Sequence, residues 1–302
     1  MPAFEEYRQQ IGKLLGAYHT GLAQVDPSGS TSTLLDANTL KSTLNIDSLF
    51  DDYYLLRPDA ANANDILRIV ETYSPVSGTI TTDRPYTSAV STEQYELHGI
   101  VEPWTDMQDV VNESLKRIYL EVEFTFTAVA DQTRHSLASA ASWLEHAWQV
   151  RQVGYLTSSE DRNKNDPFAS RVVKGHPEKI SNIVYLVHPG RTFSTSDTIY
   201  VKAVAMDYDY CRASSSGDFG DRQGLAAEAH EAIPDINWVA YGAMIELWNR
   251  FSHLLSARGN SEIMLSQQKA AARFTDLNNS RFQMPARTFR PMISVGGPGY
   301  TF

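Results

Sequence analysis

The stretch from Leu120 to Val129 alternates apolar and polar residues almost without interruption. Successive side chains of a β-strand point to opposite faces of its sheet, so this alternation predicts a strand with one buried and one solvated face. Further apolar runs follow at 148–155, 183–187 and 198–204, and the polar stretch 158–167 predicts a long loop. Strands with such irregular connections favour an antiparallel β-sandwich of jelly-roll type over residues 120–221.

The flanking parts of the chain carry a helical period instead. Apolar residues recur at three- and four-residue steps, which predicts amphipathic helices. These stripes run from Phe4 to Leu22, from Trp104 to Ile118, from Trp238 to Leu255 and from Ile263 to Leu277. Glycines at positions 12, 16 and 21 weaken the first helix, by about 1 kcal/mol each. Gly259 and Asn260 separate the last two helices.

Residues 33–97 read as short elements. The pattern predicts a short strand followed by a short helix around Asp47–Leu55 within residues 33–56. Between residues 65 and 97, β-branched runs alternate with breaks at Pro75–Gly78 and Asp83–Pro85. Such runs, separated by Gly and Pro turns, predict a small antiparallel element.

These elements predict an α+β fold. Segments 1–119 and 222–280 pack together as a mainly helical region that includes the small β element at 65–97, and residues 120–221 form the central sandwich. Residues 281–302 form an extended C-terminal arm, because 282–302 hold three prolines, three glycines and no helical period. Free in solution, the composition of this arm predicts no order of its own.

Charge is spread unevenly along the chain. The net charge is −10, which argues against a free-standing nucleic-acid binder because affinity for phosphates comes mostly from Lys and Arg. From Tyr241 onward, seven basic residues face three acidic ones, so this segment carries +4 and residues 1–240 carry −14. The asymmetry predicts a basic tail that meets an acidic partner surface. No apolar run reaches 18 residues, and the start of the chain lacks the pattern of a secretory signal, so we expect no membrane association.

A search for chemistry finds no catalytic, cofactor or metal motif. No nucleophile elbow, P-loop or dinucleotide-binding glycine pattern occurs, and the eight histidines show no metal-binding spacing. We interpret Asp47, Asp51 and Asp52 as the solvated face of a helix rather than as a cation loop. Asp207 and Asp209 alternate with tyrosines, which is typical of the outer face at a strand end. The single cysteine, Cys211, is expected to be a buried free thiol.

Residues 33–129 resemble the N-terminal region of head-to-tail connector (neck or adaptor) proteins of tailed bacteriophages. The matching segments are Thr33-Leu-Leu-Asp-Ala, Asp51-Asp-Tyr-Tyr, Ile66-Leu-Arg-Ile-Val-Glu-Thr-Tyr-Ser, Ser77-Gly-Thr-Ile-Thr-Thr-Asp-Arg-Pro-Tyr, Tyr95-Glu-Leu-His-Gly and the helix with Val111-Asn-Glu-Ser-Leu. The segment Ile233-Pro-Asp-Ile-Asn-Trp is also similar to the start of a later helix in that family. The likeness covers about two-thirds of the chain, and its motifs are structural and degenerate.

The resemblance implies a non-enzymatic virion protein at the head-tail junction, assembled in the host cytoplasm. It would form a homo-oligomeric ring, expected to be dodecameric, bound to the portal protein and to a tail or second neck protein. Genomic DNA would pass through the lumen without sequence-specific binding, and an acidic lining would suit this passage because tight binding stalls it. We expect the arm to anchor the ring on the portal or on an adjacent subunit. Its candidate partner-binding residues are Arg281, Arg287, Phe289, Arg290, Ile293, Tyr300 and Phe302.

Other functions stay open. The first alternative, after the connector, is another tail or capsid component, such as a tail terminator or baseplate adaptor. A carbohydrate-binding or receptor-binding virion module built on the β region is a further alternative, with Trp143 and Trp148 as candidate sugar platforms. An enzyme with a widely scattered site is the last alternative, and it would show a deep pocket with perturbed carboxylates.

Overall fold

The protein is described here by a computed structural model. The structure describes ten segments, which are residues 1–43, 46–90, 92–132, 134–136, 149–168, 176–180, 183–187, 193–217, 219–257 and 261–281.

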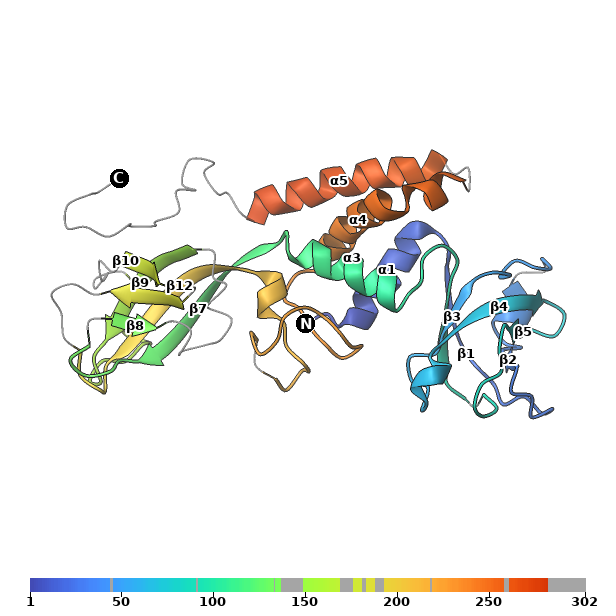
Figure 1. Cartoon of the computed structure of the whole chain (residues 1–302), viewed down its shortest axis with the longest axis horizontal. Coiled ribbons are helices and arrows are strands. Elements are labelled where there is room, and N and C mark those ends of the chain that lie inside the picture. The colour runs from blue at the N-terminus through green and yellow to red at the C-terminus, as the bar shows by residue number, and fades with distance from the viewer. Residues whose placement is uncertain are drawn as a thin grey trace.

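Three structural units follow one another along an elongated molecule (Figure 1). A curled six-stranded sheet, residues 18–98, occupies one end and is called the half-barrel. Helices from both ends of the sequence form the helical unit in the middle, and the β unit, residues 119–206, lies at the other end. The α+β class predicted from the sequence is confirmed.

The half-barrel is an antiparallel sheet with strand order β1-β6-β3-β4-β5-β2. Its strands are β1 (Tyr18–Leu22), β2 (Thr33–Leu35), β3 (Tyr54–Leu56), β4 (Leu67–Ser74), β5 (Thr79–Thr82) and β6 (Gln94–His98), with the short helices α2 (Leu40–Thr43) and η1 (Ala63–Asp65) between them. A bridge between Gln24 and Leu35 joins the regions of the two edge strands, which is why the sheet curls around its core. That core includes the fully buried Leu34, Leu55 and Tyr95.

The helical unit combines α1 (Phe4–Leu15), α3 (Thr105–Leu115), η3 (Asp207–Tyr210), α4 (Ile236–Ala257) and α5 (Ser261–Arg281). One core unites their apolar faces, with Tyr7, Val111 and Trp238 among its buried members. Helices α3 and α4 approach closely at Gly242, where an added Cβ would lie 2.0 Å from the Ser114 hydroxyl oxygen. The Ser114 hydroxyl donates to the Val239 carbonyl across the same contact, at 2.9 Å.

The β unit contains two three-stranded antiparallel sheets in its described residues, with orders β7-β12-β9 and β10-β11-β8. The strands are β7 (Tyr119–Thr127), β8 (Arg134–Ser136), β9 (Gln149–Leu156), β10 (His176–Ile180), β11 (Ile183–Val187) and β12 (Thr198–Met206). The alternation that predicted the first strand is confirmed in β7, because Val122 is buried while Glu121 and Glu123 are exposed. The predicted strands at 183–187 and 198–204 are confirmed as well.

The first predicted helix is shorter than its apolar stripe. Helix α1 ends at Leu15, where Gly16 adopts a left-handed φ of 69° and caps the helix through its N–H to the Lys13 carbonyl. Glycine reaches this conformation without the steric penalty that other residues pay, so it stops helices readily. Residues 18–22 then form the edge strand β1 instead of a further helical turn.

The predicted helix around Asp47–Leu55 is also wrong. Turns occupy residues 47–52, and β3 begins at Tyr54. Two residues of this stretch, Ser48 and Asp52, have positive φ angles of 62° and 65°, which interrupt a right-handed helix. The β element of the N-terminal region is therefore larger than residues 65–97, because it recruits β1, β2 and β3 into one sheet.

The later helices follow the sequence closely. Helices α3, α4 and α5 cover most of the predicted stripes. Helix α4 ends at Ala257 and α5 begins at Ser261, and the predicted break at Gly259 and Asn260 lies outside the described residues. Among the described helices, none is long and apolar enough to cross a membrane.

Candidate functional site

Of the arm residues proposed from the sequence, only Arg281 lies within the described part of the chain. Arg281 is the last residue of α5, so it continues a helix rather than starting an extended segment. Arg287, Phe289, Arg290, Ile293, Tyr300 and Phe302 lie outside the described residues, as do Trp143 and Trp148. The candidate sites that geometry can define are therefore in the body of the molecule.

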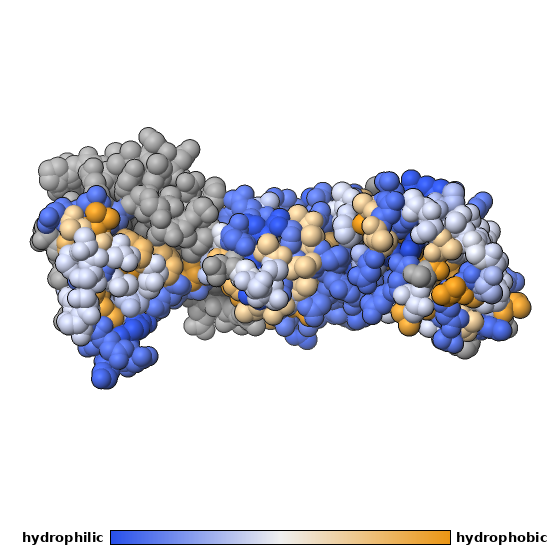
Figure 2. Space-filling view, turned by 90° about the horizontal axis from the view of Figure 1, so that it is seen from below, coloured by the Kyte–Doolittle hydropathy of each residue, from blue (hydrophilic) through white to orange (hydrophobic). Residues whose placement is uncertain are grey.

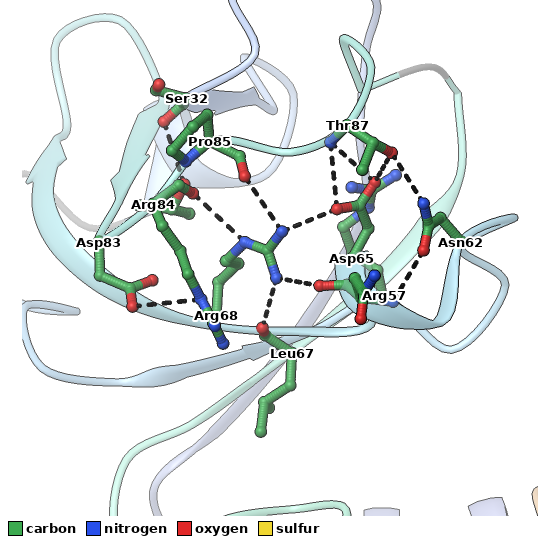
Figure 3. A network of polar contacts seen from close by, with 12 residues as sticks. Ser32, Arg57, Asn62, Asp65, Leu67, Arg68, Asp83, Arg84, Pro85 and Thr87 are labelled. Atoms are coloured by element: carbon green, nitrogen blue, oxygen red, sulfur yellow. Dashed lines mark hydrogen bonds and ion pairs between the residues drawn. The ribbon is translucent and has the colours of Figure 1, made fainter.

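A buried polar network lies at one end of the half-barrel, centred on Arg68 (Figure 3). Its guanidinium donates to the Asp65 carboxylate at 2.7 Å, and to the carbonyls of Arg84 at 3.2 Å and Pro85 at 3.1 Å. Asp65 accepts two further bonds from the Thr87 N–H, at 3.1 and 3.0 Å. Arg68 and Asp65 are both less than 5% exposed, so η1 and β4 deliver a paired charge into the interior.

Tyr86 stacks against two arginines beside this network. Arg57 lies over its ring at 4.3 Å and Arg68 at 4.9 Å, which are cation–π distances. Burial raises the pKa of Tyr86 to about 12, although both cations oppose the rise. Arg57 also pairs with the Glu93 carboxylate.

A polar cavity of about 550 Å³ lies beside Arg57 and Asp65. Its walls carry the side chains of Arg57, Asp59, Asn62, Asp65, Thr87 and Glu93, together with Leu22 and Gln94 from the ends of β1 and β6. Burial alone would raise the pKa of Asp65, but the Thr87 hydrogen bonds and the nearby arginine charges outweigh it and lower that pKa. Because Arg57 pairs with Glu93 and Arg68 pairs with Asp65, the contacts support a role in fixing the loops around 57–68 and 83–93.

A second buried network joins the half-barrel to the helical unit. Arg8 of α1, which is 0% exposed, makes a bidentate contact with Glu96 of β6 at 2.9 and 3.0 Å. Arg8 also pairs with Glu228, and the His98 ring contacts Glu96 at 2.9 Å. Burial would raise the pKa of Glu96, but hydrogen bonds with His98 and Arg8 lower it to about 2. The network holds the two units in one fixed orientation.

Asp207 is the exception among the buried charges. It begins η3, where the chain leaves β12, and it is 0% exposed within the helical core. The backbone amide of Ile233 is nearby, yet neither carboxyl oxygen has a hydrogen bond of good geometry in the described part of the chain. Burial raises its pKa well above the ordinary value. The predicted placement of Asp207 and Asp209 on an outer strand face is wrong, because both lie buried in a 3₁₀ turn.

Cys211 follows directly and is buried and free, as expected. Its thiol donates to the Asp207 carbonyl at 3.3 Å. Burial first, and the nearby Asp207 second, raise the pKa of this thiol, so it stays protonated and unreactive. Among the residues that the structure describes, no three His, Cys, Asp or Glu side chains gather as a metal site.

An apolar groove crosses the helical unit between α1, α4 and α5. It has a volume of about 440 Å³ and is lined by Leu14, Tyr241, Met244, Ala270 and Ala272, with Lys269, Arg273 and Asp276 also on its walls.

Comparison of the chain with known protein families, curated proteins and solved structures gives no match. The sequence and the geometry therefore carry the functional argument.

Proposed function

We propose that the protein is a virion component that joins the portal vertex of a tailed-phage capsid to the tail. In this proposal, copies of the chain form a ring around the passing genomic DNA, and the portal and a tail or second neck protein bind its two sides. An elongated chain with separate units at its ends suits this task, because each unit can meet a different neighbour (Figure 1).

The observation that carries the proposal is the location of the acidic charge. The half-barrel holds eleven acidic and four basic residues, so it carries −7 of the total of −10, while the β unit has nine of each. A wall of this sign repels phosphates and lets DNA slide without being held. We therefore assign the half-barrel to the wall of the DNA channel and the β unit to the outer side of the ring.

The junction of the units supports a ring of fixed geometry. The buried contact of Arg8 with Glu96 and Glu228 ties the half-barrel to the helical unit. Breaking a buried charge pair by removing one partner typically costs about 3–5 kcal/mol, so the joint resists bending. Identical subunits close a ring only if each presents its two contact surfaces at a constant angle.

We also propose that the two sheets of the β unit pack face to face as a sandwich of jelly-roll type. His135 of β8 lies 5.7 Å from the Phe126 ring of β7 and 5.8 Å from that of Phe193. Phe193 belongs to the core that covers β7, β9 and β12, so the second sheet reaches the core of the first.

The arm remains part of the proposal as the anchor on the portal or a neighbouring subunit. Figure 1 shows that the C-terminal end of α5 points toward the β unit. A truncation after Arg281 keeps α5 complete and tests the arm alone. The truncated protein should keep its thermal stability and lose binding to a portal ring, and normal binding would remove the arm from the proposal.

The first test is the mass and symmetry of the purified chain, measured by light scattering and negative-stain class averages with and without a portal-like partner. A ring of about twelve copies with a pore that admits duplex DNA supports the proposal. A ring that forms only on the partner supports it as well. A chain that stays monomeric with every virion partner contradicts it and favours the glycan-binding alternative.

A further inference from the structure

The groove of the helical unit is an unfilled apolar surface with basic groups at its edge. Met244 and Ala270 are only 3% exposed and form its floor, whereas Lys269, Ala272 and Arg273 are exposed on α5. No residue of the half-barrel lines this groove in the described part of the chain. The volume of about 440 Å³ is within the usual range of binding pockets.

The turn at 46–52 in the half-barrel has the opposite character. Ile46 is 57% exposed, and the exposed acids Asp47 and Asp52 follow it in the same turn. The turn therefore offers a partner one apolar side chain and two acidic groups within seven residues. Figure 2 shows further apolar residues at this end of the molecule, beside the largely hydrophilic middle.

Contacts with neighbouring side chains hold the turn in place. Phe50 is 4% exposed and makes edge-on contacts with the rings of Tyr53 at 5.4 Å and Tyr73 at 5.0 Å. The Asp51 carboxylate accepts a hydrogen bond from the Tyr73 N–H at 2.9 Å. The positive φ angles of Ser48 and Asp52 lie within the same turn. Unusual backbone angles persist where the surrounding contacts enforce them, and they gather at functional surfaces.

We propose that this turn of one copy docks into the groove of the next copy. Ile46 enters the apolar floor, and Asp47 and Asp52 meet Lys269 and Arg273. Lys269 and Arg273 outnumber Asp276 on the walls of the groove, so the two surfaces complement each other in charge and in apolar content, and they lie on different units of the chain. Such a head-to-tail contact uses a different surface on each partner, so it repeats from copy to copy and closes a ring when the rotation allows. The inference rests on the ring of the proposed function and names its subunit contact.

The decisive experiment mixes two variants, each of which lacks one side of the contact. Ala272→Trp fills the groove from an exposed position, and Ile46→Asp removes the apolar plug from the turn. Each variant alone should assemble at least about tenfold more weakly than the wild type, because interface anchors carry most of the binding energy. Their equimolar mixture should stop at a dimer in mass photometry, since one intact turn meets one intact groove. Either variant assembling like the wild type would overturn the inference, and thermal unfolding checks that both fold.

A crosslink separates this inference from the proposed function. Cys211 is buried, so a chain with Ile46→Cys and Ala272→Cys carries two accessible thiols at the proposed contact. Oxidation should give a ladder of covalent oligomers, while the two single variants mixed together should give mainly dimers. If the wild type forms a ring but the double variant gives no ladder, the proposed subunit contact is wrong and the connector function stays supported. If the ladder forms but the wild type never forms a ring, the contact is supported and the connector function is wrong. If neither a ring nor a ladder forms, both proposals are wrong.

Discussion

Two buried aspartates show how differently the half-barrel and the helical unit treat charge. Asp65 is 3% exposed and receives hydrogen bonds from Arg68 and Thr87, which lower its pKa against the opposing effect of burial. Asp207 is 0% exposed, lacks a charged partner in the described part of the chain, and has its pKa raised by burial. The half-barrel buries this charge as a pair, while the helical unit buries an acid whose pKa burial raises.

The two residues therefore link stability to pH with opposite signs. Asp65, with a lowered pKa, stabilises the fold above its unfolded pKa of about 3.9, and this contribution disappears as the pH falls through its folded pKa. Asp207, with a raised pKa, contributes fully below about pH 3.9 and loses its contribution as the pH rises toward its folded pKa. Acid weakens one unit through Asp65 and strengthens the other through Asp207.

The largest effect is expected from breaking the pair in the half-barrel. Asp65→Ala leaves Arg68 buried without its counter-charge, and we expect a loss of about 3–5 kcal/mol in the free energy of unfolding. Urea denaturation followed by fluorescence measures the change, with Asp59→Ala at an exposed neighbouring position as the matched control. A loss below about 1 kcal/mol would mean that the pair behaves like a surface salt bridge.

Asp207→Asn should raise the free energy of unfolding, whereas Asp65→Ala lowers it. The amide cannot ionise, so the variant should become increasingly more stable than the wild type as the pH rises above about 4. The difference should grow by about 1.4 kcal/mol per pH unit until the wild-type carboxyl ionises in the fold. Urea denaturation of both proteins between pH 4 and 8 gives the difference directly, and Asp59→Asn reports the general effect of losing one acid. A difference that does not change with pH would show that Asp207 is charged in the fold.

Two tyrosine variants compare the half-barrel with the helical unit through a smaller change in the free energy of unfolding. The Tyr95 hydroxyl in the half-barrel donates to the Asp36 carboxylate, and the Tyr7 hydroxyl in the helical unit donates to the Pro234 carbonyl, each at 2.8 Å. Hydrogen bonds to charged groups contribute about 1.5–3 kcal/mol and those to neutral groups about 0.5–1.5 kcal/mol. Tyr95→Phe should therefore destabilise more than Tyr7→Phe in the same denaturation assay. Equal losses would show that the charge of Asp36 adds nothing.

The sequence predicts those elements whose side chains obey one period from start to end. Helix α3 and strand β7 are of this kind, because each turns a single apolar face toward a core. It fails at α1, where the apolar stripe continues past Gly16 into a strand, because Tyr18 and Leu22 of β1 stand four positions apart and so also fit the helical period. It fails again at 47–52, where Phe50 anchors a turn that no local periodicity reveals.

The buried networks are less accessible to sequence reasoning. Asp65 and Arg68 stand three positions apart, a spacing that suggests an ion pair, but nothing local shows that both are buried. Arg8 and Glu96 are 88 positions apart, and only the packing of α1 against β6 brings them together. The burial of Asp207 contradicts its polar neighbourhood in the sequence, because the chain turns at η3 and directs it into the helical core.

The smallest effect is expected at an exposed pair in the helical unit, which tests whether burial rather than pairing sets these energies. Lys116 and Glu113 meet at 2.7 Å, closely matching the distance of the Arg68–Asp65 pair, but their side chains are 41% and 37% exposed. A hydrogen bond to Glu113 raises the pKa of Lys116. Water already solvates both groups, and Lys116→Ala should change the unfolding free energy by no more than about 0.5 kcal/mol. Two ion pairs with the same N–O distance would then differ several-fold in their contribution to the free energy of unfolding. A loss near that of Asp65→Ala would instead show that distance, rather than burial, sets this contribution.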